Sequence, residues 1–189
     1  MWPVALLGVG AALLAVSSRG PKNLVSVKSE TNGKTYAVQN LPDKQAAAEC
    51  MAKIHDKLEK LINHYKEDPA SMADPRIKVM IDRFNPDNMM ENDLDDSSTS
   101  YSENKGEKIV VCLRDKRDGY PLVDENTVMF VILHEMAHLM TTTIGHNPEF
   151  WSNFRRLLHD ACGLGIYSEV NYAKNPTDYC GMTITDTPI

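Results

Sequence analysis

The chain has few cysteines and no excess of basic residues. Four cysteines among 189 residues are too few for a scaffold built on disulfides, and none of them forms a C-x-x-C pair. A net charge of -6 and a pI near 5.5 argue against nucleic acid as a partner, because phosphate binding needs clustered lysine and arginine. The rest of the composition, 42% hydrophobic and 24% charged, is that of an ordinary folded protein, and the length fits one domain.

The sequence supports two predictions about the four cysteines. Cys50 falls in a helical pattern and Cys112 in an apolar run typical of a strand, so both are expected to be buried thiols. Cys162 and Cys180 could pair in an oxidising compartment, and the sequence leaves their redox state open.

An apolar segment lies at the start of the chain. Residues 3–16 form a run of 14 residues without charge, and Arg19 and Lys22 follow it. As a helix this run would be about 21 Å long, short of the roughly 30 Å hydrocarbon core of a bilayer. Because the basic residues follow the run, the pattern favours a single-pass membrane anchor over residues 1–20, with membrane contact through residues 3–16. The alternatives are a cleaved signal segment with a secreted domain, and a buried or tail segment.

Hydrophobic periodicity predicts the first half of the remaining chain. Residues 24–29 and 35–39, separated by Asn32-Gly33, predict a hairpin with a two-residue turn. Apolar residues spaced by three and four predict a long helix over residues 43–68, and a proline after an aspartate begins a shorter helix that ends near Phe84.

The next segments are a loop and a strand. Residues 86–100 hold five acids and no base, which predicts a solvated surface loop; the alternative is a calcium or substrate loop. Residues 104–106 predict a turn, and residues 108–113 predict a buried strand. This strand could be the sheet edge on which an extended peptide adds, or it could be internal.

The motif H-E-x-x-H stands in an apolar helical run at residues 128–140. His134 and His138, four apart on a helix, project from one face, so both imidazoles can reach one zinc ion. Glu135 follows the first of them and is placed to act as the general base on a water. Because the helix is apolar almost all round, unpartnered histidines there would be costly, which favours a metal site over histidines satisfied within a core.

A catalytic zinc usually has three protein ligands, and His146 is the best candidate for the third. Three threonines after the motif are poor helix formers, and Gly145 permits the positive φ that lets the chain turn back. Asn147-Pro148 then begins another helix. The rival third ligands are Glu149, His159 and Glu169.

The sequence gives weaker indications for the other polar residues. His55 and His64, on the early helix, are expected at the surface, and His159 is expected to be partly exposed. Two further groups are candidates near the metal, with packing as the alternative for each: three tyrosines that could stabilise an oxyanion, and the Cys-Gly-Met run at residues 180–182. The tyrosines are Tyr167, Tyr172 and Tyr179.

The run H-E-M-A-H-L-M-T-T-T-I-G-H-N-P-E-F-W, residues 134–151, resembles the WLM and SprT-like zinc metallopeptidases. In these families H-E-x-x-H is followed by Gly-His and then by an aromatic residue that begins the next helix. Residues 166–185 also resemble WLM-type proteins of large DNA viruses, so the similarity covers roughly residue 101 to the C-terminus. Cellular members cleave proteins crosslinked to DNA, and this acidic chain departs from them, so that substrate is not carried over.

The resemblance implies that His134, His138 and His146 bind Zn2+ and that Glu135 is catalytic. It also implies an α+β fold: a zincin-like domain with a small β-sheet packed on the H-E-x-x-H helix. The apolar run at the start of the chain adds the expectation of an N-terminal apolar helix before this domain. We expect one metallopeptidase domain at residues 21–189, with its catalytic part at about 101–189.

The function expected is zinc-dependent hydrolysis of peptide bonds in a protein or peptide substrate. Two alternatives remain open. The first is a structural or virion membrane protein that zinc stabilises and that has no protease activity. The second is a zinc hydrolase of a non-peptide amide. The presence of Glu135 favours chemistry, because a structural zinc site has no need of a base.

Overall fold

The computed structural model describes residues 21–96, 98–103, 108–117 and 119–189. The predicted apolar helix at residues 3–16 and the predicted turn at residues 104–106 lie outside these ranges. The elements are β1 (Leu24–Lys28), β2 (Thr35–Gln39), α1 (Lys44–Glu67), α2 (Pro69–Ala73), α3 (Pro75–Arg83), η1 (Pro86–Asn88), β3 (Met89–Glu91), β4 (Tyr101–Glu103), β5 (Lys108–Val111), α4 (Glu125–Met140), α5 (Pro148–Gly163), β6 (Thr177–Tyr179) and β7 (Met182–Ile184). The α+β class expected from the sequence is confirmed.

The main sheet has the strand order β1-β2-β3-β5-β4. Strands β2, β3 and β5 run parallel, whereas β1 and β4 are antiparallel to their neighbours. Strand β5 is therefore internal, and β4 is the edge strand nearest the H-E-x-x-H helix. The sequence allowed residues 108–113 to form either an edge strand or an internal strand, and in the structure the strand is internal.

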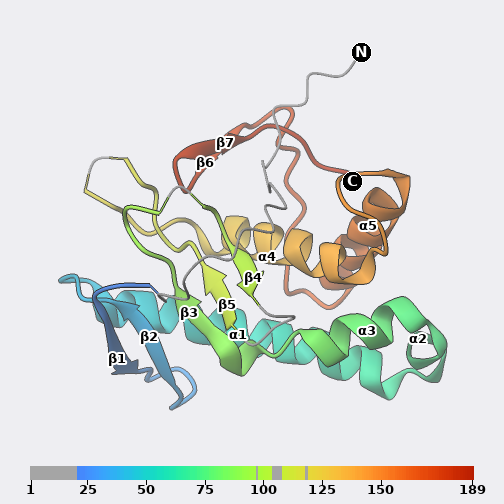
Figure 1. Ribbon diagram of the computed structural model, residues 1–189, viewed down its shortest axis with the longest axis horizontal. Helices are drawn as coiled ribbons and strands as arrows, with labels where there is room; N and C mark the ends of the chain where they lie inside the picture. Colours follow the sequence, from blue (N-terminus) through green and yellow to red (C-terminus); the bar gives the residue numbers. More distant parts are fainter. Residues whose placement is uncertain (1–20, 97, 104–107, 118) are drawn as a thin grey trace.

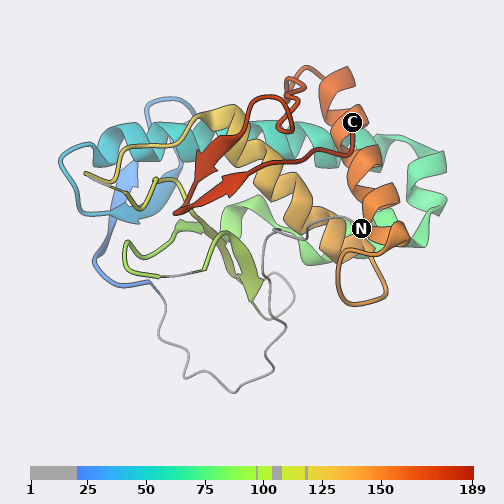
Figure 2. The ribbon, with the colours of Figure 1, turned by 90° about the horizontal axis from the view of Figure 1, so that it is seen from above.

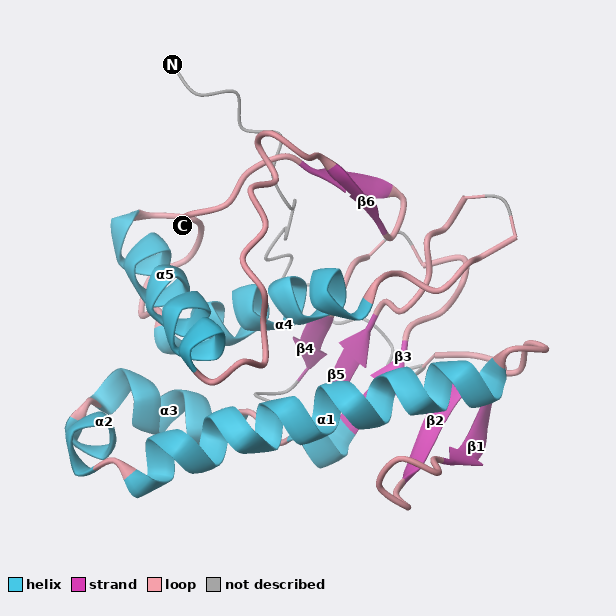
Figure 3. Cartoon of the chain, turned by 180° about the vertical axis from the view of Figure 1, so that it is seen from behind, coloured by secondary structure: helices cyan, strands magenta, loops and turns pink. Residues whose placement is uncertain are grey.

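Helices α1 and α4 cover the same face of this sheet, as the views from the front and from behind show (Figures 1 and 3). Fully buried apolar side chains fill the space between the layers, among them Leu58 of α1, Val111 of β5 and Leu133 of α4. Helix α5 packs against α4, where the rings of Phe130 and Phe154 lie 5.1 Å apart. The motif helix is thus held on two sides by the core.

Most of the predicted helices are confirmed. An aspartate and a proline begin α3 as expected, because Asp74 accepts a hydrogen bond from the Arg76 amide. The predicted end of the long helix at Asp68 is also correct, but Asp68 then caps the short helix α2, which was not predicted.

Two local predictions are wrong. The first hairpin does not have a two-residue turn, because the Ser29 amide still donates to the Lys34 carbonyl and the loop lies between these residues. The Glu49 carboxylate accepts hydrogen bonds from the Glu30 and Thr31 amides of this loop. The acidic stretch at residues 86–100 is not wholly a solvated loop. It contains β3, and Glu91 of this strand is buried. Its carboxylate can be buried because it pairs with Arg114 at 2.7 Å and accepts a hydrogen bond from the Gln39 amide of β2.

The cysteine expectations are also corrected. Cys112, predicted to be a thiol, forms a disulfide with Cys180, while Cys162 stays free. The disulfide joins the end of β5 to the β6–β7 hairpin, which lies over α4 in the view from above (Figure 2). Tyr179 reinforces the link, because its hydroxyl donates to the Cys112 carbonyl at 2.9 Å. Local sequence spacing does not reveal a pairing across 68 residues.

The predicted membrane localisation is corrected as well. No helix among the described residues is long and apolar enough to cross a bilayer, so these residues do not support the predicted single-pass anchor.

Candidate metal centre

Helix α4 presents two histidines from within the core. Asp124 caps the helix by accepting a hydrogen bond from the Thr127 amide at 3.0 Å, and the following residues are almost all buried. His134 is only 1% exposed, and His138 lies one turn further on, half-buried. Their Nε2 atoms lie 3.1 Å apart, so both rings face the same point.

A loop returns His146 to this point. The helix ends at Met140, as the three threonines predicted, and Gly145 adopts a φ of +93°, a conformation that side chains with a Cβ rarely take. The Asn147 side chain then accepts a hydrogen bond from the Phe150 amide and begins α5. The result places His146 Nε2 3.2 Å from His134 Nε2.

The Glu149 carboxylate binds the same loop. It accepts hydrogen bonds from the Thr142 amide and hydroxyl and from the Thr143 hydroxyl, at 3.0 to 3.3 Å. These contacts engage both oxygens of the Glu149 carboxylate with the loop. The structure therefore brings His134, His138 and His146 together, and the group of possible metal ligands at this place does not include Glu149.

The three imidazoles fit a zinc ion. Their candidate ligand atoms all lie within 4.8 Å of one another. Ligands 2.0 to 2.1 Å from a tetrahedral zinc would stand about 3.3 Å apart, close to the 3.1 and 3.2 Å between the Nε2 atoms. Burial and the neighbouring histidines lower the pKa of His134 to about 2, and burial lowers that of His138 to about 4. Neutral imidazole is the form that binds metal.

Aromatic residues of α5 enclose the cluster. The Phe150 ring lies 4.4 to 4.9 Å from each of the three imidazoles, and Trp151 lies 5.8 Å from His146. These rings exclude water from one side of the cluster, which strengthens electrostatic interactions there.

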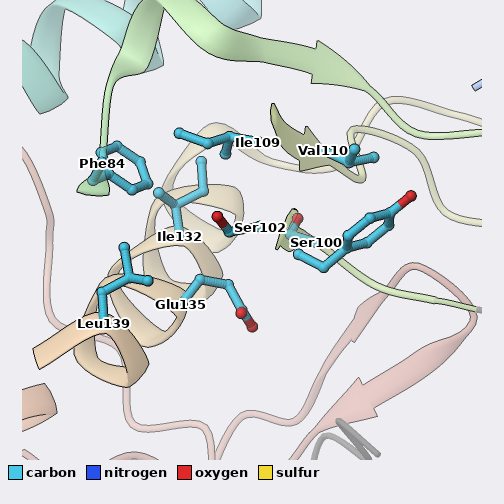
Figure 4. Close-up of a pocket in the computed structure, with 9 residues that line it drawn as sticks. Phe84, Ser100, Ser102, Ile109, Val110, Ile132, Glu135 and Leu139 are labelled. Atoms are coloured by element: carbon cyan, nitrogen blue, oxygen red, sulfur yellow. The ribbon is translucent and has the colours of Figure 1, made fainter. Parts of the chain in front are cut away.

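Glu135 lies beside the cluster on the face of α4 that meets the edge of the sheet. It lines a pocket of about 10 Å³ whose other walls are mostly apolar (Figure 4). Its Oε1 atom is buried and has no hydrogen-bond partner among the described residues. Burial raises the pKa of Glu135 to about 8. A metal dication nearby would lower this pKa again, because it favours the charged carboxylate.

Asn153 of α5 supports the end of the motif helix, a role that the sequence analysis missed. Its amide nitrogen donates to the Met140 carbonyl at 3.2 Å and to the Thr141 hydroxyl at 3.1 Å, and its oxygen accepts from Arg76. The sequence could have indicated this role, since Asn153 falls on the apolar face of an amphipathic helix, where an unpartnered amide would be costly.

The remaining sequence candidates lie elsewhere. His159 and Glu169 are exposed and are not part of the cluster. Tyr167 and Tyr172 are buried around Phe130, toward the start of α4. Tyr179 hydrogen-bonds to Ser100 and Cys112. Cys180 of the Cys-Gly-Met run is in the disulfide.

A second cluster surrounds His55, which was wrongly predicted to lie at the surface. His55 is fully buried on α1, and with Glu59 and Asp87 it forms another group with the spacing of metal ligands. The Lys34 ammonium lies within it, 3.1 Å from His55 Nε2 and 2.7 Å from Asp87 Oδ1. His64 is exposed, as expected.

The fold and the histidine cluster define an α+β domain with a candidate metal centre. The model of the WLM domain family matches residues 82–177, and the chain belongs to this family, which is associated with zinc metallopeptidases. The chain is 33% identical to an uncharacterized protein of Acanthamoeba polyphaga mimivirus over 186 residues, 97% of this chain and 94% of the relative. An uncharacterized protein of Invertebrate iridescent virus 6 is 34% identical over 59% of this chain and 62% of its own. No solved structure matches.

Proposed function

We propose that the chain is a zinc metallopeptidase with a zincin-like catalytic domain, in which His134, His138 and His146 hold Zn2+ and Glu135 is the general base. The observation that carries the proposal is the convergence of three imidazoles, one buried and two partly buried, next to a glutamate whose Oε1 has no partner among the described residues. Membership of the WLM family supports the same activity. The proposed domain covers residues 21–189, with its catalytic part at about 101–189.

Zinc, when bound, would polarise the scissile carbonyl and make a water acidic near neutral pH. The chain's own residues divide the remaining work. Glu135 would take the proton from the attacking water and deliver it to the leaving amine. Phe150 and Trp151 would keep bulk water from the histidine side of the site.

The substrate class we propose is an extended segment of a protein or peptide. Strand β4 is a sheet edge, and its residues Tyr101 and Ser102 line the same pocket as Glu135. An extended peptide that paired with this edge would pass directly beside the general base. This edge replaces the one considered on the sequence, because β5 is internal.

The test compares the wild type with Glu135→Gln, both loaded with zinc. We expect the wild-type protein to cleave proteins of an intact proteome and so to release new peptide termini. The variant should lose at least ~100-fold of that activity. Zinc content and thermal midpoint should stay unchanged, which separates lost chemistry from lost folding. If Glu135→Gln matches the wild type while His138→Ala unfolds the protein, zinc is structural and the peptidase proposal fails.

A further inference from the structure

Two buried oxygens without partners line the pocket beside the candidate active site. One is Glu135 Oε1 on α4, and the other is the Ser102 hydroxyl on the edge strand β4. Neither makes a hydrogen bond to any residue that the structure describes. In Figure 4 the Ser102 side chain lies between those of Ile109 and Glu135. Leaving a buried polar group unpaired costs more than a typical hydrogen bond contributes, so both oxygens need a partner.

The walls of the pocket leave few partners for them. Most of its lining side chains are apolar: Phe84, Ile109, Val110, Ile132 and Leu139. The Ser100 hydroxyl also lines the pocket, but it is already 2.7 Å from the Tyr179 hydroxyl and accepts from the Cys112 amide. The Ser102 hydroxyl and Glu135 Oε1 are thus the two unsatisfied side-chain oxygens of one small cavity.

The chemistry of the two groups is complementary. An ionised carboxylate only accepts hydrogen bonds, whereas a serine hydroxyl can donate one. The pocket measures about 10 Å³, which is close to the room that one water molecule needs. A single water held there could accept from Ser102 and donate to Glu135, and the apolar walls would offer it no competing partner.

We propose that Ser102 is a positioning residue for Glu135: its hydroxyl is linked to Glu135 Oε1 through one water in this pocket and fixes the rotation of the carboxylate. This inference rests on the proposed function. With Oε1 held by the link, Oε2 is the oxygen left to receive the proton of the reacting water. The same strand that would pair with an extended substrate then also sets the orientation of the base, so substrate binding and catalysis meet on β4.

The activity test compares Ser102→Ala with Ser102→Thr, which keeps the hydroxyl on a residue that suits a strand. Both are measured beside Ser152→Ala, a serine-to-alanine control on the exposed surface of α5. We expect Ser102→Ala to lower kcat roughly 3- to 10-fold, the effect of one orienting hydrogen bond, with KM and zinc content unchanged. Ser102→Thr should recover most of the loss, and Ser152→Ala should match the wild type.

A second readout does not depend on activity. A high-resolution crystal structure of the wild type should contain a water within hydrogen-bond distance of Ser102 Oγ and Glu135 Oε1, and Ser102→Ala should lose it. The thermal midpoint of Ser102→Ala should fall or stay level. A hydroxyl that truly lacked a partner would instead raise the midpoint on removal, because its burial cost would vanish.

The outcomes separate the two proposals. If the wild type and Glu135→Gln are equally inactive, the peptidase proposal fails and the crystal structures alone decide the Ser102 link. If the wild type is active and Ser102→Ala keeps the wild-type kcat, the positioning role is wrong. A wild-type structure without the bridging water, or with a higher midpoint for Ser102→Ala, also overturns it.

Discussion

Among the described residues, two clusters of side chains have the spacing of metal ligands, and they differ in what lies at their centre. In the first, His134, His138 and His146 face one another, with Nε2 atoms 3.1 and 3.2 Å apart. In the second, the Lys34 ammonium lies among His55, Asp87 and Glu59, 3.1, 2.7 and 3.5 Å from their nearest atoms.

This difference indicates which of the two clusters needs a cation from outside the chain. Acceptor atoms that converge without a cation repel one another and lose their hydration. The second cluster has its cation built in, and Asp87 shows the effect, because the hydrogen bond from Lys34 lowers the pKa of its carboxyl. The first cluster has only imidazoles, so we infer that a metal ion completes it. Spacing alone does not separate the two.

Removing one imidazole from the first cluster should have the largest effect. We expect His138→Ala to weaken zinc binding by more than ~100-fold, since loss of groups that merely orient ligands already costs 10- to 100-fold. Titration calorimetry measures the affinity, with His64→Ala as an exposed histidine control on α1. Equal zinc affinity in His138→Ala and the wild type would show that zinc does not bind at the first cluster.

The support behind the first cluster should matter next. We expect Asn153→Ala to weaken zinc binding by about 10-fold and to lower the free energy of unfolding by roughly 1–3 kcal/mol, because the Met140 carbonyl and the Thr141 hydroxyl lose a partner. Calorimetry and urea unfolding measure the two effects. The exposed Asn63→Ala is the control, and an effect of that size there would show that the assay does not report on the cluster.

The first cluster should also make the metal-free chain sensitive to acid. Burial lowers the pKa of His138 from 6.5 to about 4, so in that range the unfolded chain binds a proton that the folded chain does not. Stability should therefore fall as pH decreases from about 6.5 toward 4. Urea unfolding at pH 7 and pH 5, with EDTA present, measures the fall. His138→Ala should reduce it, and an unchanged pH dependence would contradict the burial of neutral imidazoles.

The smallest effect should come from the second cluster. In a His138→Ala background, we expect Lys34→Met to lower the free energy of unfolding by about 0.5–1 kcal/mol, because the ion pairs of Lys34 are partly exposed. Millimolar zinc should then raise the thermal midpoint of the double variant but not that of His138→Ala alone. Lys53→Met, an exposed lysine on α1, is the control. Zinc stabilisation with Lys34 still present would show that the ammonium does not fill this cluster.

The sequence predicted much of the first cluster and none of the second. H-E-x-x-H on an apolar helix and the positive φ of Gly145 are local features, because spacing and backbone preference determine them. His55 was expected at the surface because histidines on helices are usually at least partly exposed. Its burial depends on η1 and on the first hairpin, which approach it from distant parts of the chain.

Other features of the fold escaped prediction for the same reason. The Cys112–Cys180 disulfide and the buried Glu91–Arg114 pair join segments that no local pattern connects. Strand β3 was hidden in an acidic stretch, because the buried charge of Glu91 is compatible with a strand only once Arg114 is beside it. Ser102 gave no signal at all, since a serine in a short strand is most often a surface residue.

We propose that the first cluster binds zinc and that the second does not. The most direct measurement is the zinc content of wild-type protein after loading and desalting, combined with zinc X-ray absorption spectroscopy. We predict one zinc per chain with imidazole ligands, lost in His138→Ala. A chain that retains no zinc, or one whose zinc persists in His138→Ala with carboxylate ligands, would show that the three histidines do not form the zinc site.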